Sequence, residues 1–317
     1  MNVSVVIPAY NAAPFLSRAV ESALQHDEVK EVLLIEDGSK DATLDMCEQL
    51  VQAHSRVKLL RHPKGVNMGA GASRNLGIKN ATQDYISFLD ADDYYTNIRF
   101  QKEKEVFKNN PDADGVYGAI GVEYLDAVGA QAWEAKGLDG KSLTTVNKYI
   151  PSKHLFEYIS GIENPNGYEG YFSIDGLTIK RTAIIKSKLE FNISLRLHQD
   201  TVFMWQASYY FKLYTGEFEV PVAVRGVHSE NRFIHKSRLN TTRSKQYKVL
   251  RDWGIQEALD TQVVYRFHLR FFRNYLRSKN RWKRPIFYTK LLIDDTFTRR
   301  LFGKKQIKLV KKLTFNE

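Results

Sequence analysis

VSVVIPAYN, residues 3–11, begins with a run rich in β-branched residues and ends in a proline and a polar turn. The run has the length and composition of a buried strand, and it should end at the proline, which cannot donate to a neighbouring strand. Three more apolar runs of strand length follow, at 32–35, 57–60 and 85–89, with helix-like stretches at 14–25, 41–53 and 70–80 between the runs. This alternation predicts an α/β fold with a mostly parallel sheet flanked by helices.

Later segments are less regular, and residues 111–175 are rich in Gly, Asn, Asp and Pro. Beyond them we expect a strand at 176–180, a helix at 197–210, a strand at 218–224 and basic helices from about residue 240. Ligands of such sheets bind beyond the carboxyl ends of the strands, so the residues that follow each run are the candidates for a site.

The first two strand ends carry groups that suit a nucleotide. Tyr10 follows the first run and could stack on a flat ring, and Asp37 follows the second run and could accept a hydrogen bond from a ring N–H or a ribose hydroxyl. The alternative at each position is a plain turn with a helix cap. After the third run, Gly69 and Gly71 open a small-residue segment that is not a dinucleotide loop, because Arg74 stands where Gly or Ala is required. Arg74 is available to a phosphate or a base, with a solvated arginine as the alternative.

Asp90-Ala91-Asp92-Asp93 follows the fourth run. In extended chain Asp90 and Asp92 point to the same side, where two carboxylates repel unless a cation lies nearby. Oxygen ligands suit Mg²⁺ or Mn²⁺, and such an ion could bind a diphosphate. The alternative for this motif alone is a hydrated acidic turn.

Together the four segments resemble the family 2 glycosyltransferases of the GT-A fold over roughly residues 1–230. The resemblance rests on VIPAYN at 6–11, EDGSKD at 36–41, the segment 67–77 and FLDADD at 88–93. It implies that Pro8, Ala9 and Tyr10 line a base pocket and that Asp37 accepts a hydrogen bond from uracil. The chain departs from the family pattern at Glu36, where aspartate is usual.

The resemblance also implies roles near the sugar and the diphosphate. Arg74 would lie beside the nucleotide, and Asp90-Ala91-Asp92 would bind the nucleotide sugar, with Asp90 by the ribose and Asp92 on a Mn²⁺ or Mg²⁺ ion. His228 would lie near the diphosphate as a second metal ligand, although a lone histidine is more often structural.

The family places a catalytic aspartate before a late helix, and Asp200 is the match here, with Gln199 in place of the usual glutamate. Three other carboxylates are alternative bases because they lie in the loops expected to face the acceptor: Glu163, Glu169 and Asp175.

These assignments predict an inverting hexosyltransferase. It would transfer a hexose or N-acetylhexosamine from a UDP-sugar to an acceptor hydroxyl on a glycan or lipid-linked glycan, in surface polysaccharide or glycolipid synthesis. The main alternative is a non-catalytic nucleotide-sugar-binding protein on the same fold, since a fold does not establish an activity. A nucleotidyltransferase is a further alternative. A nucleic-acid-binding protein is disfavoured, because no nucleic-acid module is recognisable.

The charge of the chain is uneven. The formal net charge is +11, yet residues 225–317 hold 24 basic and 7 acidic residues. We therefore expect two parts, a catalytic domain at 1–230 and a basic helical region at 231–317. The single cysteine, Cys47, permits no internal disulfide, and the first strand begins too early for a secretory leader. We expect a cytoplasmic protein.

Four arginines, at 266, 270, 273 and 277, are spaced to form one stripe on a helix, and a second basic helix is expected at 304–313. Such helices favour peripheral contact with anionic lipid at the inner face of the membrane. A packed appendage with a solvated basic face is the alternative.

Overall fold

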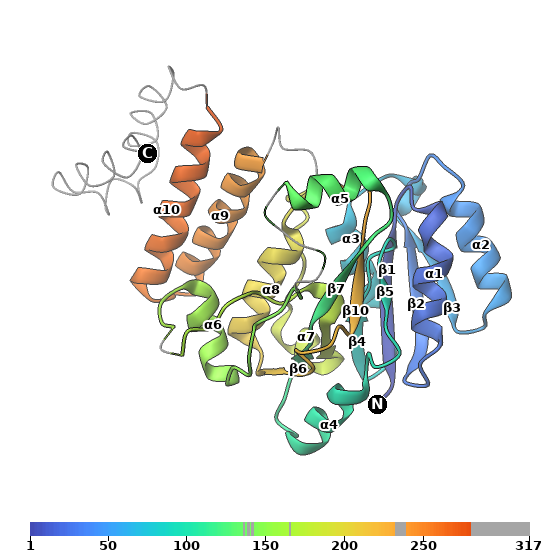
Figure 1. Cartoon of the computed structure of the whole chain (residues 1–317), viewed down its shortest axis with the longest axis horizontal. Coiled ribbons are helices and arrows are strands. Elements are labelled where there is room, and N and C mark those ends of the chain that lie inside the picture. Colours follow the sequence, from blue (N-terminus) through green and yellow to red (C-terminus); the bar gives the residue numbers. More distant parts are fainter. Residues whose placement is uncertain (136, 138–139, 141–142, 165, 232–238, 280–317) are drawn as a thin grey trace. The chain divides into compact units, whose positions relative to one another are not determined.

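The computed structural model describes residues 1–135, 137, 140, 143–164, 166–231 and 239–279. The chain divides into two compact units, Met1–Ile234 and His235–Glu317. The boundary predicted from the sequence lies after residue 230. That the first part is catalytic and the second a basic extension stays a prediction. Figure 1 shows the elements of both units.

A seven-stranded sheet forms the centre of the first unit, in the order β3-β2-β1-β4-β8-β6-β9. The strands are β1 (Val3–Ala9), β2 (Val29–Glu36), β3 (Val57–Arg61), β4 (Tyr85–Phe88), β6 (Gly115–Tyr117), β8 (Leu177–Lys180) and β9 (Leu213–Thr215). The first four are mutually parallel, as predicted, and β8 is antiparallel to both β4 and β6. The mixed, mostly parallel α/β architecture is confirmed.

Successive residues of β1 point into two different cores, as the period of a strand requires. Val5 and Ile7 pack with Leu16 and Val20 of α1, whereas Val6 packs with residues on the opposite face. Helices cover both faces: α1 (Ala13–Leu24), α2 (Thr43–Ala53), α3 (Ala70–Asn80), α4 (Gln101–Asn109), α5 (Ala127–Glu134), α6 (Ser152–Ser160), α7 (Arg181–Ser187) and α8 (Gln199–Tyr210). Short 3₁₀ turns lie at Pro63–Gly65 and Ile174–Gly176.

A second, three-stranded sheet was not predicted. It has the order β5-β10-β7, with β5 at Tyr94–Tyr95, β7 at Ile120–Tyr124 and β10 at Ala223–Val227. The expected strand at 218–224 is wrong in its first half. The Glu217 carboxylate accepts hydrogen bonds from the backbone N–H groups of Glu219 and Val220, and Pro221 cannot donate to a ladder, so β10 begins only at Ala223.

The second unit contains α9 (Leu239–Gln256) and α10 (Thr261–Arg277) among its described residues. The apolar face of α10 is buried, including Val264, Phe267 and Phe271, whereas Arg273 and Arg277 are exposed. Two members of the predicted arginine stripe are thus exposed, whereas Arg266 and Arg270 are half-buried and Arg270 lies over the Tyr247 ring of α9. The second basic helix, at 304–313, falls outside the described residues.

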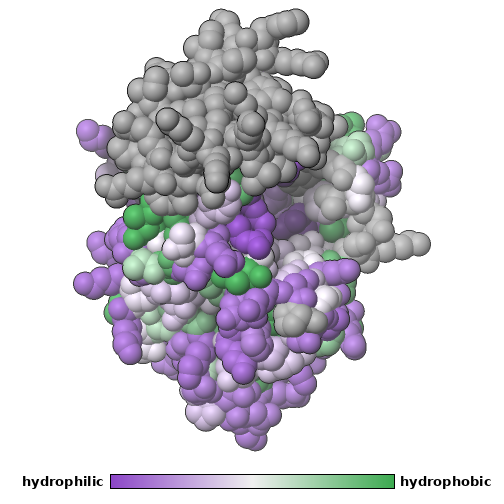
Figure 2. All heavy atoms as spheres, turned by 90° about the vertical axis from the view of Figure 1, so that its left-hand side faces the viewer, coloured by the Kyte–Doolittle hydropathy of each residue, from purple (hydrophilic) through white to green (hydrophobic). Residues whose placement is uncertain are grey.

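In the described part of the chain, no helix combines the length and apolar character needed to cross a bilayer. On the face of the molecule shown in Figure 2, hydrophilic side chains predominate and the hydrophobic residues form small separate patches.

Candidate functional site

The carboxyl ends of β1 and β2 form one side of the candidate site. The strand was predicted to end at Pro8, but β1 continues through Pro8, which pairs with Ile35, and ends at Ala9, with Tyr10 directly after it. The backbone N–H of Asp37 donates to the Ala9 carbonyl at 2.9 Å. Pro8 and Tyr10 are half-buried, whereas Ala9 is buried. The sequence-predicted base-pocket residues therefore lie together, next to Asp37.

The Asp37 carboxylate already holds a loop. It accepts hydrogen bonds from the backbone N–H groups of Met68 at 2.7 Å and Gly69 at 2.8 Å, and the residue is only 2% exposed. Gly69 has a φ of 90°, which favours glycine, and a Cβ there would come within 2.6 Å of the Arg196 guanidinium. Asp37 thus positions the loop that leads into α3, and its contact with uracil stays a prediction.

Arg74 projects from α3 toward the end of β4, where it forms an ion pair with Asp90. The residue is 2% exposed, and burial by itself would lower the pKa of the guanidinium. The charges of Asp90, Asp200 and Asp175 outweigh burial and raise that pKa, so Arg74 stays charged. Its Nε and Nη1 atoms are buried and make no hydrogen bond within the described residues, which leaves two donors of a cation unsatisfied.

Asp200 lies in the first turn of α8 and is half-buried. The helix begins two residues later than predicted, because His198 has a φ of 66°, in the left-handed region that ends regular helix. A carboxylate in the first turn is stabilised by the helix dipole, and the charge of Asp200 also acts on Arg74 and Arg225. Gln199, which stands in place of the family's glutamate, is buried with its Oε1 atom unpaired within the described residues.

The structure brings Asp92 and His228 together, 136 positions apart in the chain. The Asp92 Oδ2 atom lies 3.2 Å from Nε2 of His228 and accepts a hydrogen bond from the Asn231 amide at 2.9 Å. The hydrogen bond between His228 and the Asp92 carboxylate raises the pKa of the imidazole, against the opposing effect of burial. Asn231 was not predicted from the sequence.

A buried layer lies behind these residues. Asp93 accepts a hydrogen bond from the backbone N–H of Gly226 at 2.9 Å, and Asp175 accepts one from the backbone N–H of Asp90 at 2.9 Å. Burial raises the pKa of Asp93 well above its usual range and that of Asp175 to about 6. The half-buried Arg225 is the countercharge, and it donates to Ser173, which in turn donates to Asp175.

Two sets of side chains could hold a divalent cation: a group of three carboxylates, and the pair of Asp92 and His228. Asp90, Asp93 and Asp175 each offer an oxygen within 4.8 Å of the others. Asp93 and Asp175, however, are buried, each accepts a backbone hydrogen bond, and Arg225 already supplies a positive charge beside both. Asp92 beside His228 fits an ion better, because its side chain is 32% exposed and a carboxylate with an imidazole can bind Mn²⁺ or Mg²⁺.

Of the alternative bases, Glu163 and Glu169 are exposed, and Asp175 is buried with its carboxylate occupied. No role was predicted from the sequence for Asp93 or Arg225, although both belong to the site. The signal for Asp93 was its place in the acidic motif, and the signal for Arg225 was its place three residues before His228.

Comparison with known proteins gives this arrangement a family context. Residues 4–158 match the family model described as Glycosyl transferase family 2. An uncharacterized glycosyltransferase of Haemophilus influenzae is 36% identical over 109 residues, 34% of this chain and 43% of the relative. The chondroitin synthase of Pasteurella multocida is 40% identical over 93 residues, 29% of this chain and 9% of that enzyme. The chain thus matches less than half of the length of these curated relatives.

The solved structure of S. aureus TarS, residues 1–349, superposes with a TM-score of 0.64 at 16% identity, covering 98% of this chain and 86% of TarS. TarS has also been solved in complex with UDP and with UDP-GlcNAc. The likeness confirms that the fold is that of the GT-A glycosyltransferases.

Proposed function

We propose that this chain is an inverting glycosyltransferase. It moves a hexose or N-acetylhexosamine from a UDP-sugar to a hydroxyl of a glycan or lipid-linked acceptor, in the synthesis of a surface polysaccharide or glycolipid. The observation that carries the proposal is the meeting of Arg74, Asp90, Asp92, Asp200 and His228 at the carboxyl edge of the parallel strands. The catalytic part is residues 1–230, with residues 231–317 as a basic extension.

The donor occupies the edge formed by β1, β2 and β4. Tyr10 stacks on the base and Asp37 accepts from the uracil ring, with Pro8 and Ala9 beside them. Asp90 and Ala91 contact the ribose and the sugar. The unsatisfied Nε and Nη1 donors of Arg74 support this placement, since an anionic ligand supplies what a buried guanidinium lacks.

Asp92 and His228 hold a Mn²⁺ or Mg²⁺ ion. The ion, when bound, supplies positive charge to the diphosphate as the sugar departs. Binding through His228 requires the neutral imidazole, so metal affinity depends on pH, and the raised pKa of His228 beside Asp92 moves the loss of metal to higher pH.

Asp200 is the general base. Its carboxylate accepts the proton of the acceptor hydroxyl while that oxygen forms a bond to the anomeric carbon, and the bond from that carbon to the diphosphate breaks. One base without a nucleophile on the opposite side gives a single displacement with inversion. Proton transfer of this kind contributes about 10²–10⁴-fold to the rate.

The decisive experiment is a screen of nucleotide sugars with Mn²⁺, Mg²⁺ or EDTA, read by the release of nucleoside diphosphate, first without acceptor and then with candidate glycans. We expect release from a UDP-sugar that depends on the metal. The Asp200→Asn variant should bind the donor with unchanged affinity but lose transfer, because an amide cannot accept the proton.

The control is Glu105→Gln, which neutralises an exposed carboxylate on α4 and should transfer like the wild type. Normal transfer by Asp200→Asn would assign the base elsewhere. Tight donor binding without release or transfer under every condition would instead support the non-catalytic binding protein.

A further inference from the structure

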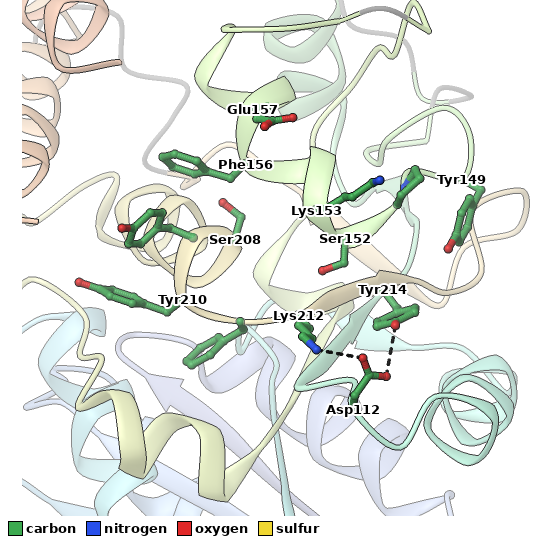
Figure 3. A pocket seen from close by; sticks show the side chains of 13 residues that line it. Asp112, Tyr149, Ser152, Lys153, Phe156, Glu157, Ser208, Tyr210, Lys212 and Tyr214 are labelled. Atoms are coloured by element: carbon green, nitrogen blue, oxygen red, sulfur yellow. Dashed lines mark hydrogen bonds and ion pairs between the residues drawn. The ribbon is translucent and has the colours of Figure 1, made fainter. Parts of the chain in front are cut away.

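A concave site lies away from the strand ends that form the candidate active site. Its volume is about 540 Å³, within the range of small-molecule sites. Figure 3 shows Phe156 and Glu157 of α6 on one side, and Lys212, Asp112 and Tyr214 on the other. All of the lining residues belong to the first unit.

The topology places this pocket at the amino ends of the parallel strands, whereas Asp90 and Asp92 lie at their carboxyl ends. Because β6 and β9 run parallel to β4, Asp112 before β6 and Lys212 before β9 lie at the amino ends of these strands. The last turn of α8 contributes Tyr209, whereas Asp200 lies in its first turn. At 1.5 Å per residue the two are about 14 Å apart along the helix.

Aromatic rings dominate the lining. Tyr149 is 53% exposed and Tyr209 is 41% exposed, and Tyr209 packs edge-to-face on Phe156 with centroids 5.1 Å apart. Tyr210, Phe211 and Tyr214 complete the aromatic part. Exposed, mutually supported rings present flat apolar surfaces at little entropic cost, and such surfaces stack against the apolar face of a pyranose.

The polar groups of the pocket suit hydroxyls rather than a charged ligand. The four charged lining residues, Asp112, Lys153, Glu157 and Lys212, sum to zero. Lys212 pairs with Asp112 at 3.1 Å, and Tyr214 donates to the same carboxylate at 3.3 Å. A neutral polyhydroxylated ligand can donate to the carboxylates and accept from the lysines without breaking a charge balance. An anion would meet two carboxylates and no arginine.

We propose that this pocket binds a neutral oligosaccharide segment of the acceptor or product glycan, at a distance from the reaction centre. The inference rests on the proposed glycosyltransferase function. Tyr149 and Tyr209 stack on the sugar rings, and the Asp112–Lys212 pair binds their hydroxyls. Holding one part of a glycan here raises the effective concentration of another part at the carboxyl edge of the sheet.

The test uses the full chain and four neutral tetrasaccharides as probes: maltotetraose, cellotetraose, chitotetraose and mannotetraose. Saturation-transfer NMR titrations give the Kd of each. We expect binding of at least one probe, with a Kd about tenfold weaker in Tyr149→Ala and in Tyr209→Ala. Tyr149→Phe keeps the ring and should bind like the wild type. So should Ile185→Ala, which removes a 55% exposed apolar side chain elsewhere in the same unit.

The release of UDP from the donor without acceptor should be unchanged in Tyr149→Ala, since the pocket is remote from the donor edge. That readout separates the two ideas: absent release in the wild type counts against the proposed function, whereas the NMR titration addresses the pocket alone. No binding of any tetrasaccharide would overturn the pocket assignment. So would equal affinity in the wild type and both alanine variants, or tighter binding of a sulfated tetrasaccharide than of every neutral one.

Discussion

Replacing Asp175 by asparagine should make the stability of the protein less sensitive to pH. Asp175 is 1% exposed, and burial, with the nearby charge of Asp90, raises its pKa from 3.8 to about 6 despite the opposing effect of Arg225. One pKa unit corresponds to 1.36 kcal/mol, so keeping this carboxyl ionised costs about 3 kcal/mol of folding free energy at neutral pH.

The sign follows from proton binding. Between pH 4 and pH 6 the folded state keeps the proton on Asp175 while the unfolded chain releases it, so the stability of the wild type falls as pH rises through this window. The asparagine variant has no proton to lose. Its free energy of unfolding relative to the wild type should therefore increase by up to about 3 kcal/mol between pH 4 and pH 8.

Urea denaturation at several pH values, in metal-free buffer and followed by tryptophan fluorescence, measures this difference. Comparing the same two proteins across pH removes the constant cost of losing the Ser173 and Asp90 hydrogen-bond geometry. Asp27→Asn, at an exposed carboxylate, is the control and should follow the wild type. A constant difference between Asp175→Asn and the wild type at all pH values would refute the reasoning, because Asp175 would then not titrate within the window.

Three further outcomes test the site and the basic region. Calorimetry should show tighter binding of UDP than of GDP or CDP. Asp37→Ala should lose the binding of UDP, because the variant removes the uracil acceptor and releases the loop at Gly69. Equal affinities for the three nucleotides would contradict the base assignment. Asp92→Ala should abolish metal-dependent turnover, as EDTA does in the wild type, and full activity in EDTA would exclude the proposed metal role. The protein should co-sediment with vesicles rich in phosphatidylglycerol at low salt but not at high salt. The double variant Arg273→Glu with Arg277→Glu should co-sediment less, since each basic residue near an anionic surface contributes about 1 kcal/mol. Equal sedimentation with neutral vesicles would favour a packed helix with a solvated basic face.

The first four strands could be predicted because each is a local run with clear ends. Apolar runs alternate with amphipathic helices, and the polar residues that follow them mark the strand ends to within two residues, as Asp90 does after β4 and Tyr10 after β1. Parallel order then places the strand ends at one edge, so Asp37 and Asp90 could be expected to lie near each other. The inference needs only local pattern and the geometry of crossovers.

The second sheet and the buried layer could not be predicted in this way. β5 has two residues and β10 follows a turn that Glu217 and Pro221 create, so neither has a periodic pattern long enough to read. The contacts of Asp175 and Arg225 depend on segments far apart in sequence, and a carboxylate in a glycine-rich stretch gives no sign that it will be buried.

The buried layer explains how Asp92 and His228 come together. Asp93 accepts the backbone N–H of Gly226, and the Asp92 carbonyl lies so close that a Cβ at Gly226 would meet it at 2.3 Å. These two contacts join the acidic turn after β4 to β10. Asp93 is one residue from Asp92, and Gly226 is two residues from His228. Burying Asp93 raises its pKa and costs folding free energy, which only a specific arrangement of the backbone offsets. An apolar residue at position 93 would make the fold more stable, but it could not accept the Gly226 N–H. The Asp93 carboxyl thus positions the two side chains proposed to bind the metal.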